Sequence, residues 1–216
     1  MNDQNLATRP VATLAPFQRP QRLSVRQRKN WIEILTSFDA RNKYVVYDEG
    51  GNPVFNVEDQ GSGFGSILKR LFMRKMRPFT SHVDDLAGQG QLLVLKKPFR
   101  FIFHRLEIRD ASGNLLGAIQ RRWTWLRRKY IVEGPDGQEV ATLFGPIFRP
   151  WTFQIHLPGS EAEVGLIQKK WSGLLKEAFS EADNFWVDFA QITDPQLRAV
   201  LFAATVLIDI VHFENR

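Results

Sequence analysis

The segment that most constrains this chain is the apolar run of residues 194–213, DPQLRAVLFAATVLIDIVHF. Asp194 or the threonine before it can cap a helix there, and Pro195 suits the first turn because the N–H it lacks would be unpaired. Almost nothing polar interrupts residues 199–208, and a helix that is apolar on every face must be covered by lipid or by protein. The run therefore predicts an enclosed C-terminal helix over about residues 195–213.

The length of this run decides between a helix covered by lipid and one covered by protein. A bilayer core needs roughly 20 apolar residues to cross, whereas residues 199–213 provide about 15, or about 22 Å of helix. Asp209 and His212 lie in the second half, where charge within a bilayer is costly. We therefore expect a protein-enclosed helix, with a single transmembrane helix as the alternative. Inside protein, Asp209 would need a basic or hydroxyl partner from the surrounding wall, or a position at its mouth.

Positive charge is concentrated at the start of the chain. The 216 residues carry a formal charge of +6, and residues 1–30 hold six basic side chains against one acidic one. We interpret residues 1–30 as a disordered basic tail and residues 31–216 as one domain. The first ten residues contain no apolar leader, so we expect a cytoplasmic protein. Since the chain has no cysteine, disulfides, a thiol nucleophile and thiolate metal ligands are excluded.

Short alternating segments recur along the domain, separated by turns rich in glycine, asparagine and aspartate. They cover residues 43–48, 53–57, 106–108, 115–119, 130–132, 139–143, 151–157, 163–168 and 185–189. Short strands with turn signals every 8 to 12 residues are typical of a sandwich or barrel. Closing the sheet around the apolar helix would bury the inner face of the sheet and cover the helix at once. The sequence therefore predicts an α+β, mostly β fold wrapped around the C-terminal helix.

Residues 64–77, FGSILKRLFMRKMR, depart from the strand pattern. Apolar residues at 64, 67, 68, 71 and 72 follow the i, i+3, i+4, i+7, i+8 spacing of a helix, and five of the other positions are basic: Lys69, Arg70, Arg74, Lys75 and Arg77. A basic amphipathic helix can lie on an anionic membrane. The alternative is an ordinary helix packed against the barrel with a solvated basic face.

A second basic cluster interleaves arginine with tryptophan: Arg121, Arg122, Trp123, Trp125, Arg127, Arg128 and Lys129. Tryptophan beside arginine suits the headgroup level of a membrane, and it also suits stacking on single-stranded nucleic acid. The plainer interpretation is a hairpin whose tryptophans point inward and arginines outward. All three interpretations fit the sequence.

The sequence lacks the motifs of bond-breaking enzymes. It contains no G-x-S-x-G, H-E-x-x-H or P-loop pattern. The four histidines, at positions 82, 104, 156 and 212, are far apart and show no metal-ligand spacing. We therefore expect no catalytic site.

Residues 164–189, VGLIQKKWSGLLKEAFSEADNFWVDF, closely resemble the phospholipid scramblase family. The terminal LIDIVHFE resembles the family's last helix, EILTSFDARNKYVVYDEGGNPVF its first strands, and LGAIQRRWTW its central hairpin. The likeness runs from about residue 31 to residue 214, in the family's order. It implies a fold similar to the tubby C-terminal fold, a closed antiparallel barrel of about twelve strands around a buried C-terminal helix.

The resemblance also implies a function. The family is associated with calcium-triggered, ATP-independent movement of phospholipids between leaflets. We therefore expect a scramblase-like protein that engages anionic phospholipids peripherally, at the inner face of the plasma membrane, through the basic residues named above. The alternative is a soluble interaction or signalling module that associates with nucleic acid through its basic tail.

The family's proposed calcium loop begins where residue 181 stands here. Four carboxylates are available: Glu181, Asp183, Asp188 and Asp194. Calcium needs six to eight oxygens around a tight turn, yet residues 185–189 read as a strand whose side chains alternate between two faces. Calcium is thus the only cofactor implied, and the alternative is surface acids with Asp194 capping the helix.

Overall fold

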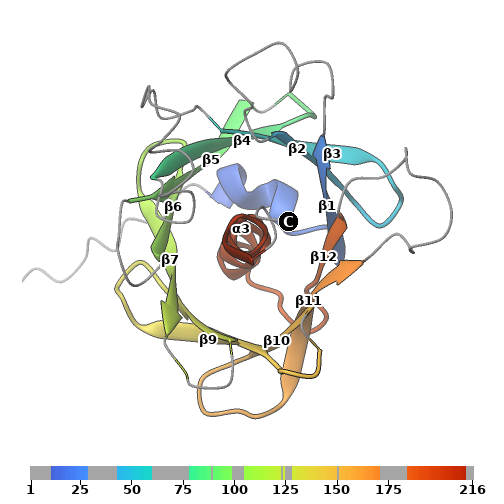
Figure 1. Cartoon of the computed structure of the whole chain (residues 1–216). Helices are drawn as coiled ribbons and strands as arrows, with labels where there is room; N and C mark the ends of the chain where they lie inside the picture. Colours follow the sequence, from blue (N-terminus) through green and yellow to red (C-terminus); the bar gives the residue numbers. More distant parts are fainter. Residues whose placement is uncertain are drawn as a thin grey trace, which may run out of the picture.

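Twelve antiparallel strands close into a barrel in the structure, which is a computed structural model (Figure 1). It describes residues 11–28, 43–59, 78–88, 90–98, 105–122, 124, 128–149, 151–170 and 184–212. Each strand pairs with the next along the chain, and β12 pairs with β1 to complete the ring. The mostly β barrel expected from the sequence is confirmed.

The elements have the following bounds. The strands are β1 (Arg22–Arg28), β2 (Lys43–Tyr47), β3 (Pro53–Asp59), β4 (Phe79–Asp85), β5 (Gly90–Lys97), β6 (Arg105–Asp110), β7 (Leu115–Arg122), β8 (Arg128–Glu133), β9 (Glu139–Gly145), β10 (Thr152–His156), β11 (Glu163–Lys170) and β12 (Asn184–Asp188). The helices are the 3-10 helix η1 (Val11–Phe17) and the α-helix α3 (Pro195–His212).

Three of the hairpin turns share one geometry. In the β2–β3 turn the N–H of Gly51 donates to Asp48 O at 3.1 Å, and the N–H of Asp48 donates to Asn52 O at 3.0 Å. The turns at residues 110–114 and 134–138 repeat both bonds. Their glycines at 51, 113 and 137 have φ of 78°, 85° and 81°, a region that side chains disfavour. The glycine signals therefore locate these hairpins correctly.

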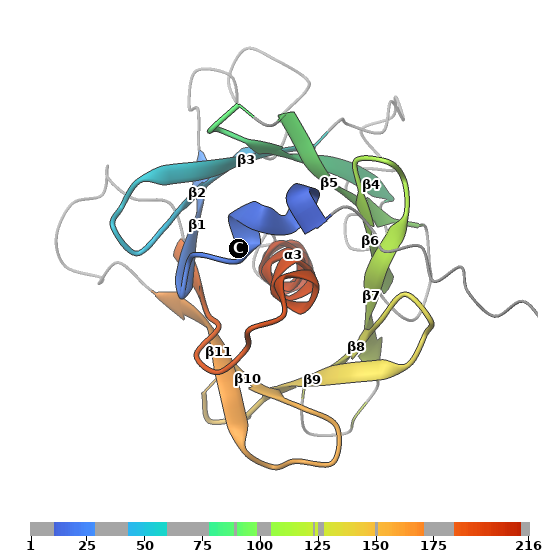
Figure 2. The same cartoon turned by 180° about the vertical axis from the view of Figure 1, so that it is seen from behind.

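The helix α3 lies inside the barrel with η1 beside it (Figures 1 and 2). Every residue from 199 to 209 is at most 4 % exposed. The helix approaches β7 so closely that a Cβ on Gly117 would lie 2.5 Å from Glu133 O and 3.0 Å from a Val200 methyl. The expectation of a protein-enclosed helix is confirmed. Among the described residues, no helix is both long and apolar enough to cross a membrane.

The two ends of α3 are held by polar contacts. Asp194 caps the helix, since its carboxylate accepts the N–H groups of Gln196 at 3.0 Å and Leu197 at 3.3 Å. Near the other end, the hydroxyl of Tyr44 on β2 donates to the Asp209 carboxylate at 2.9 Å. The expected cap and the expected hydroxyl partner from the wall are both confirmed.

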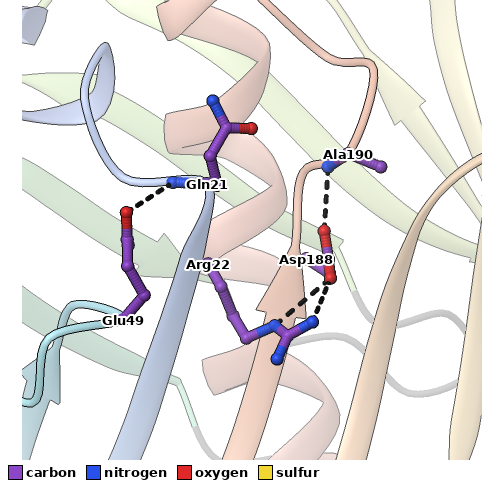
Figure 3. A network of polar contacts seen from close by, with 5 residues as sticks. All are labelled: Gln21, Arg22, Glu49, Asp188 and Ala190. Atoms are coloured by element: carbon purple, nitrogen blue, oxygen red, sulfur yellow. Dashed lines mark hydrogen bonds and ion pairs between the residues drawn. The ribbon is translucent and has the colours of Figure 1, made fainter.

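The ring closes between β1 and β12 (Figure 3). Arg22 on β1 donates to Asp188 at the end of β12, at 2.6 Å from Nη2 and 3.2 Å from Nε. The other oxygen of Asp188 accepts the N–H of Ala190 at 2.9 Å. Beside this pair, Glu49 accepts the N–H of Gln21 at 3.5 Å.

The assignment of residues 1–30 to a disordered tail was wrong for residues 11–28. The inward side chains Leu23 and Val25 of β1 are at most 2 % exposed, and β1 pairs with both β12 and β2. Only two apolar positions alternate in this strand, and Arg22 and Arg26 alternate with them. The short alternation was therefore hidden by the basic composition. Residues 1–10 and 29–30 lie outside the described residues.

Candidate functional site

Strand direction gives the barrel two distinct ends. We name the first the turn end, which contains the turns at residues 48–52, 111–114 and 134–138 and the start of α3. Odd-numbered strands run from it to the other end, which we name the basic end, and even-numbered strands run back. The basic end thus contains the last residues of β7 and β9 and the first residues of β8 and β10. Residues far apart in the sequence meet at each end.

Charged side chains are distributed unequally between these ends. Among the side chains that the structure describes, the acids at the turn end are Asp48, Glu49, Asp84, Asp85, Asp110, Glu133, Asp136, Glu139, Glu161, Glu163, Asp188 and Asp194, with Arg19, Arg22, Arg109 and the buried Arg198 among them. The basic end carries Arg26, Lys96, Lys97, Arg105, Arg121, Arg122, Arg128, Lys129, Arg149 and Lys169, with Glu58, Glu107 and the buried Asp209 as the acids there, and Arg105 is paired with Glu133 of β8 at 2.6 Å. The barrel is therefore electrically polar along its axis.

Arg121 and Arg128 lie close together where β7 and β8 meet, on the face of the sheet that holds Tyr130, and Arg122 follows on the opposite face beside Lys129. Arg121 faces Tyr130 in the strand register, and the guanidinium carbon of Arg128 lies 4.8 Å from the centre of the Phe153 ring. Burial lowers the pKa of Arg128, an effect that Tyr130 partly opposes and the charge of Arg121 reinforces. Among the residues that the structure describes, none of these three guanidinium groups has an acidic partner. Arginines clustered without acids can accept an anionic ligand.

The remaining residues expected to contact lipid lie outside the described part of the chain: Lys69, Arg70, Arg74, Lys75, Arg77, Trp123, Trp125 and Arg127. The helix over residues 64–77 stays a prediction. The strands on either side of the tryptophans do pair as a hairpin, with Tyr130 fully buried.

The turn between β9 and β10 exposes two large apolar side chains that sequence reasoning missed. Ile147 is 50 % exposed and Phe148 is 96 % exposed. A hollow of about 570 Å³ opens beside this turn and is lined in part by Phe148, Arg149 and Trp151. An apolar pair between two prolines, at 146 and 150, with no alternation around it, is the signal that could have drawn attention to the turn.

Comparison with known proteins identifies the family. The model of the scramblase family matches residues 3–215, nearly the whole chain. The chain belongs to the scramblase family. Within that family, mouse phospholipid scramblase 1 is 30 % identical over 89 % of this chain, and human phospholipid scramblase 1 is 29 % identical over 88 %. The chain spans about three fifths of the length of these two relatives, 61 % and 62 % respectively.

A solved structure has the same fold as this scramblase-family chain. An X-ray structure of a protein from Arabidopsis thaliana aligns with a TM-score of 0.50, covering 94 % of this chain and 98 % of that one. At 15 % sequence identity this likeness concerns the fold alone.

The calcium site that the scramblase family implies does not fit the carboxylates that can be tested. Asp188 already binds Arg22 with one oxygen and the N–H of Ala190 with the other. Both oxygens of Asp194 accept backbone N–H groups of α3. Within the described residues, no group of three or more acids or histidines is arranged to hold a metal ion. Glu181 and Asp183 lie outside the described residues.

Proposed function

We propose that the protein binds anionic phospholipids with the basic end of its barrel and assists their ATP-independent movement between leaflets. The observation that carries this proposal is the collection of Arg121, Arg122 and Arg128 at the end opposite the acidic turns. Family membership supports the lipid as the partner, because the relatives are phospholipid scramblases by name. We assign the protein to the cytoplasmic face of the plasma membrane, where anionic lipids give the leaflet a negative potential.

Charge separation along the barrel favours an end-on orientation. Each basic residue near an anionic surface contributes about 1 kcal/mol of attraction. Strands of seven or eight residues, such as β7 and β9, extend roughly 20 Å at about 3.3 Å per residue. This distance exceeds the Debye length of about 8 Å at physiological salt, so the turn-end acids would be screened from the membrane. Because α3 fills the barrel, we assign the lipid contact to the rim of the basic end and not to the barrel interior.

Flotation with vesicles tests the binding step. Full-length protein is mixed with phosphatidylcholine vesicles, with or without phosphatidylserine, at low and high salt. We expect binding only to the phosphatidylserine vesicles, weakened by salt. Arg121→Gln/Arg122→Gln should reduce this binding roughly tenfold or more, because two charges near the surface are lost.

The matched control removes the same charge from the turn end. Arg19→Gln/Arg109→Gln should bind as the wild type does, because both arginines belong to the turn end. Equal losses in the two variants would mean that binding follows net charge, and an absence of wild-type binding would refute lipid engagement. In vesicles loaded with a fluorescent phosphatidylserine, faster exposure of the inner-leaflet lipid without ATP would support movement between leaflets.

A further inference from the structure

We propose that Ile147 and Phe148, at the tip of the β9–β10 turn, insert between the lipids of an anionic bilayer and anchor the barrel there. The inference rests on the proposed function in that the membrane is the partner. Insertion of this tip would add an apolar contact with the acyl chains to the electrostatic contact of the basic end.

The exposure of these side chains is built into an ordered turn. The N–H of Arg149 donates to Pro146 O at 3.2 Å, and the N–H of Thr152 donates to Arg149 O at 3.1 Å. The strands on both sides pair with each other in register. The backbone therefore holds Phe148 outward at 96 % exposure. An exposed phenylalanine forgoes the favourable burial of a large apolar side chain, which a partner that covers it would supply.

The positive charge beside the tip favours an anionic bilayer as that partner. The turn follows Gly145, which faces Arg128 in the strand register, and Arg149 comes directly after the apolar pair. An apolar tip surrounded by cations matches the order of a membrane surface, where anionic headgroups lie above the acyl chains. A second copy of this end would instead bring arginines against arginines, which repel each other.

The barrel also exposes apolar side chains at its turn end. Leu86 is 50 % exposed and Leu157 is 39 % exposed. Leu86 directly follows Asp84 and Asp85, and Leu157 shares its turn with Glu161. Acids oppose approach to an anionic leaflet. The two leucines therefore provide a matched control within the same chain.

A site-specific probe tests insertion directly. Because the chain has no cysteine, Phe148→Cys carries a single thiol for an environment-sensitive fluorophore. Upon addition of phosphatidylserine/phosphatidylcholine vesicles, we expect the emission at position 148 to rise and shift to shorter wavelength. The same label in Leu157→Cys should stay unchanged. A label at position 148 that stays in a water-like environment while the protein is vesicle-bound would overturn the inference.

Partition into the same vesicles measures the contribution of the tip. Ile147→Ser/Phe148→Ser should weaken binding roughly tenfold or more and abolish the part that high salt does not remove. Leu86→Ser/Leu157→Ser should change binding less than about twofold. Thermal melting of both variants checks that the barrel remains folded.

The outcomes separate this inference from the proposed function. If the wild type floats with the vesicles and Ile147→Ser/Phe148→Ser floats equally well, insertion is refuted and lipid binding stands. If the wild type does not float, both are refuted. If Ile147→Ser/Phe148→Ser instead converts a lipid-free dimer into monomers while vesicle binding is unchanged, the tip is a self-association surface and insertion is refuted.

Discussion

At the scale of single residues, Arg198 joins the C-terminal helix to the start of the described chain. Its guanidinium donates to four backbone carbonyls. Nε donates to Ile192 O at 2.5 Å, and Nη1 donates to Gln18 O at 2.8 Å and to Phe17 O and Pro20 O at 3.2 Å each. Burial lowers the pKa of Arg198, an effect that Glu49 opposes, and arginine remains protonated at neutral pH. One side chain thus satisfies the carbonyls at the end of η1.

Replacing this side chain should destabilise the barrel strongly. Arg198→Met leaves several buried carbonyls without donors, each worth about 1–3 kcal/mol. We therefore expect the free energy of unfolding, measured by urea titration, to fall by about 3 kcal/mol or more. Arg19→Met, at an exposed position, should change it by less than about 0.5 kcal/mol. Similar values for the two variants would contradict the role given to Arg198.

Tyr130 gives a pH dependence whose sign can be worked out. Burial raises the pKa of Tyr130, and the charges of Arg121 and Arg128 oppose the rise only partly. The folded state therefore holds the phenolic proton more tightly than the unfolded state, in which the pKa is about 10. Stability from this group is present below about pH 10 and is lost above it, with a slope of up to about 1.4 kcal/mol per pH unit. Urea unfolding between pH 9 and pH 11 should decline less steeply in Tyr130→Phe, whereas parallel curves would contradict the prediction.

The partner of Asp209 on α3 could be predicted from the sequence, whereas the partners of Arg198 could not. Asp209 was expected to meet a hydroxyl from the wall, and Tyr44 supplies it. The partners of Arg198 could not be predicted in the same way. They are backbone carbonyls, three of them about 180 positions earlier in the chain, and every residue type carries such a carbonyl.

At the scale of elements, η1 is part of the core. Phe17 is fully buried, with its ring centre 4.8 Å from that of Phe55 on β3 and 5.7 Å from that of Phe202 on α3. Because the cavity left by the ring cannot refill easily, Phe17→Ala should lower the free energy of unfolding by about 3–5 kcal/mol. The control Phe148→Ala removes an equal ring from an exposed position and should leave stability in water nearly unchanged. If both variants matched the wild type by chemical denaturation, η1 would be dispensable.

The strands β4 and β5 were missed because neither shows a clean apolar alternation. The inward positions of β4 are Phe79, Ser81, Val83 and Asp85, so two of the four are polar and the alternation is masked. In β5 the apolar residues run consecutively over residues 92–95, and a continuous run does not distinguish strand from helix. The turns at residues 48–52, 110–114 and 134–138 were found because their signal does not depend on burial, whereas Gly88 and Gly90, where β4 connects to β5, were missed because no clean alternation flanks them.

At the scale of the whole molecule, the polarity of the barrel could not be predicted from the sequence. The unequal charge was visible only as the six basic residues of the first 30. The two ends differ in charge because the twelve strands alternate in direction, which brings residues from distant parts of the chain together at each end of the barrel. Placing Arg121 at the end opposite the acidic turns therefore requires the strand order and pairing of the folded barrel. The family resemblance, by contrast, gave the number of strands and the enclosed helix correctly.

This polarity leads to a prediction that separates orientation from net charge. Asp136→Asn/Glu139→Gln/Glu161→Gln adds three to the formal charge of +6, but it does so at the turn end. If the basic end faces the membrane, those positions lie beyond about two Debye lengths at 0.15 M salt. Partition into phosphatidylserine vesicles should therefore stay within about twofold of the wild type. Arg121→Gln/Arg122→Gln changes the net charge by less, yet it should weaken partition roughly tenfold or more. Flotation over a series of salt concentrations measures both, and an affinity that rises in step with net charge in the triple variant would mean that the barrel binds without a preferred end.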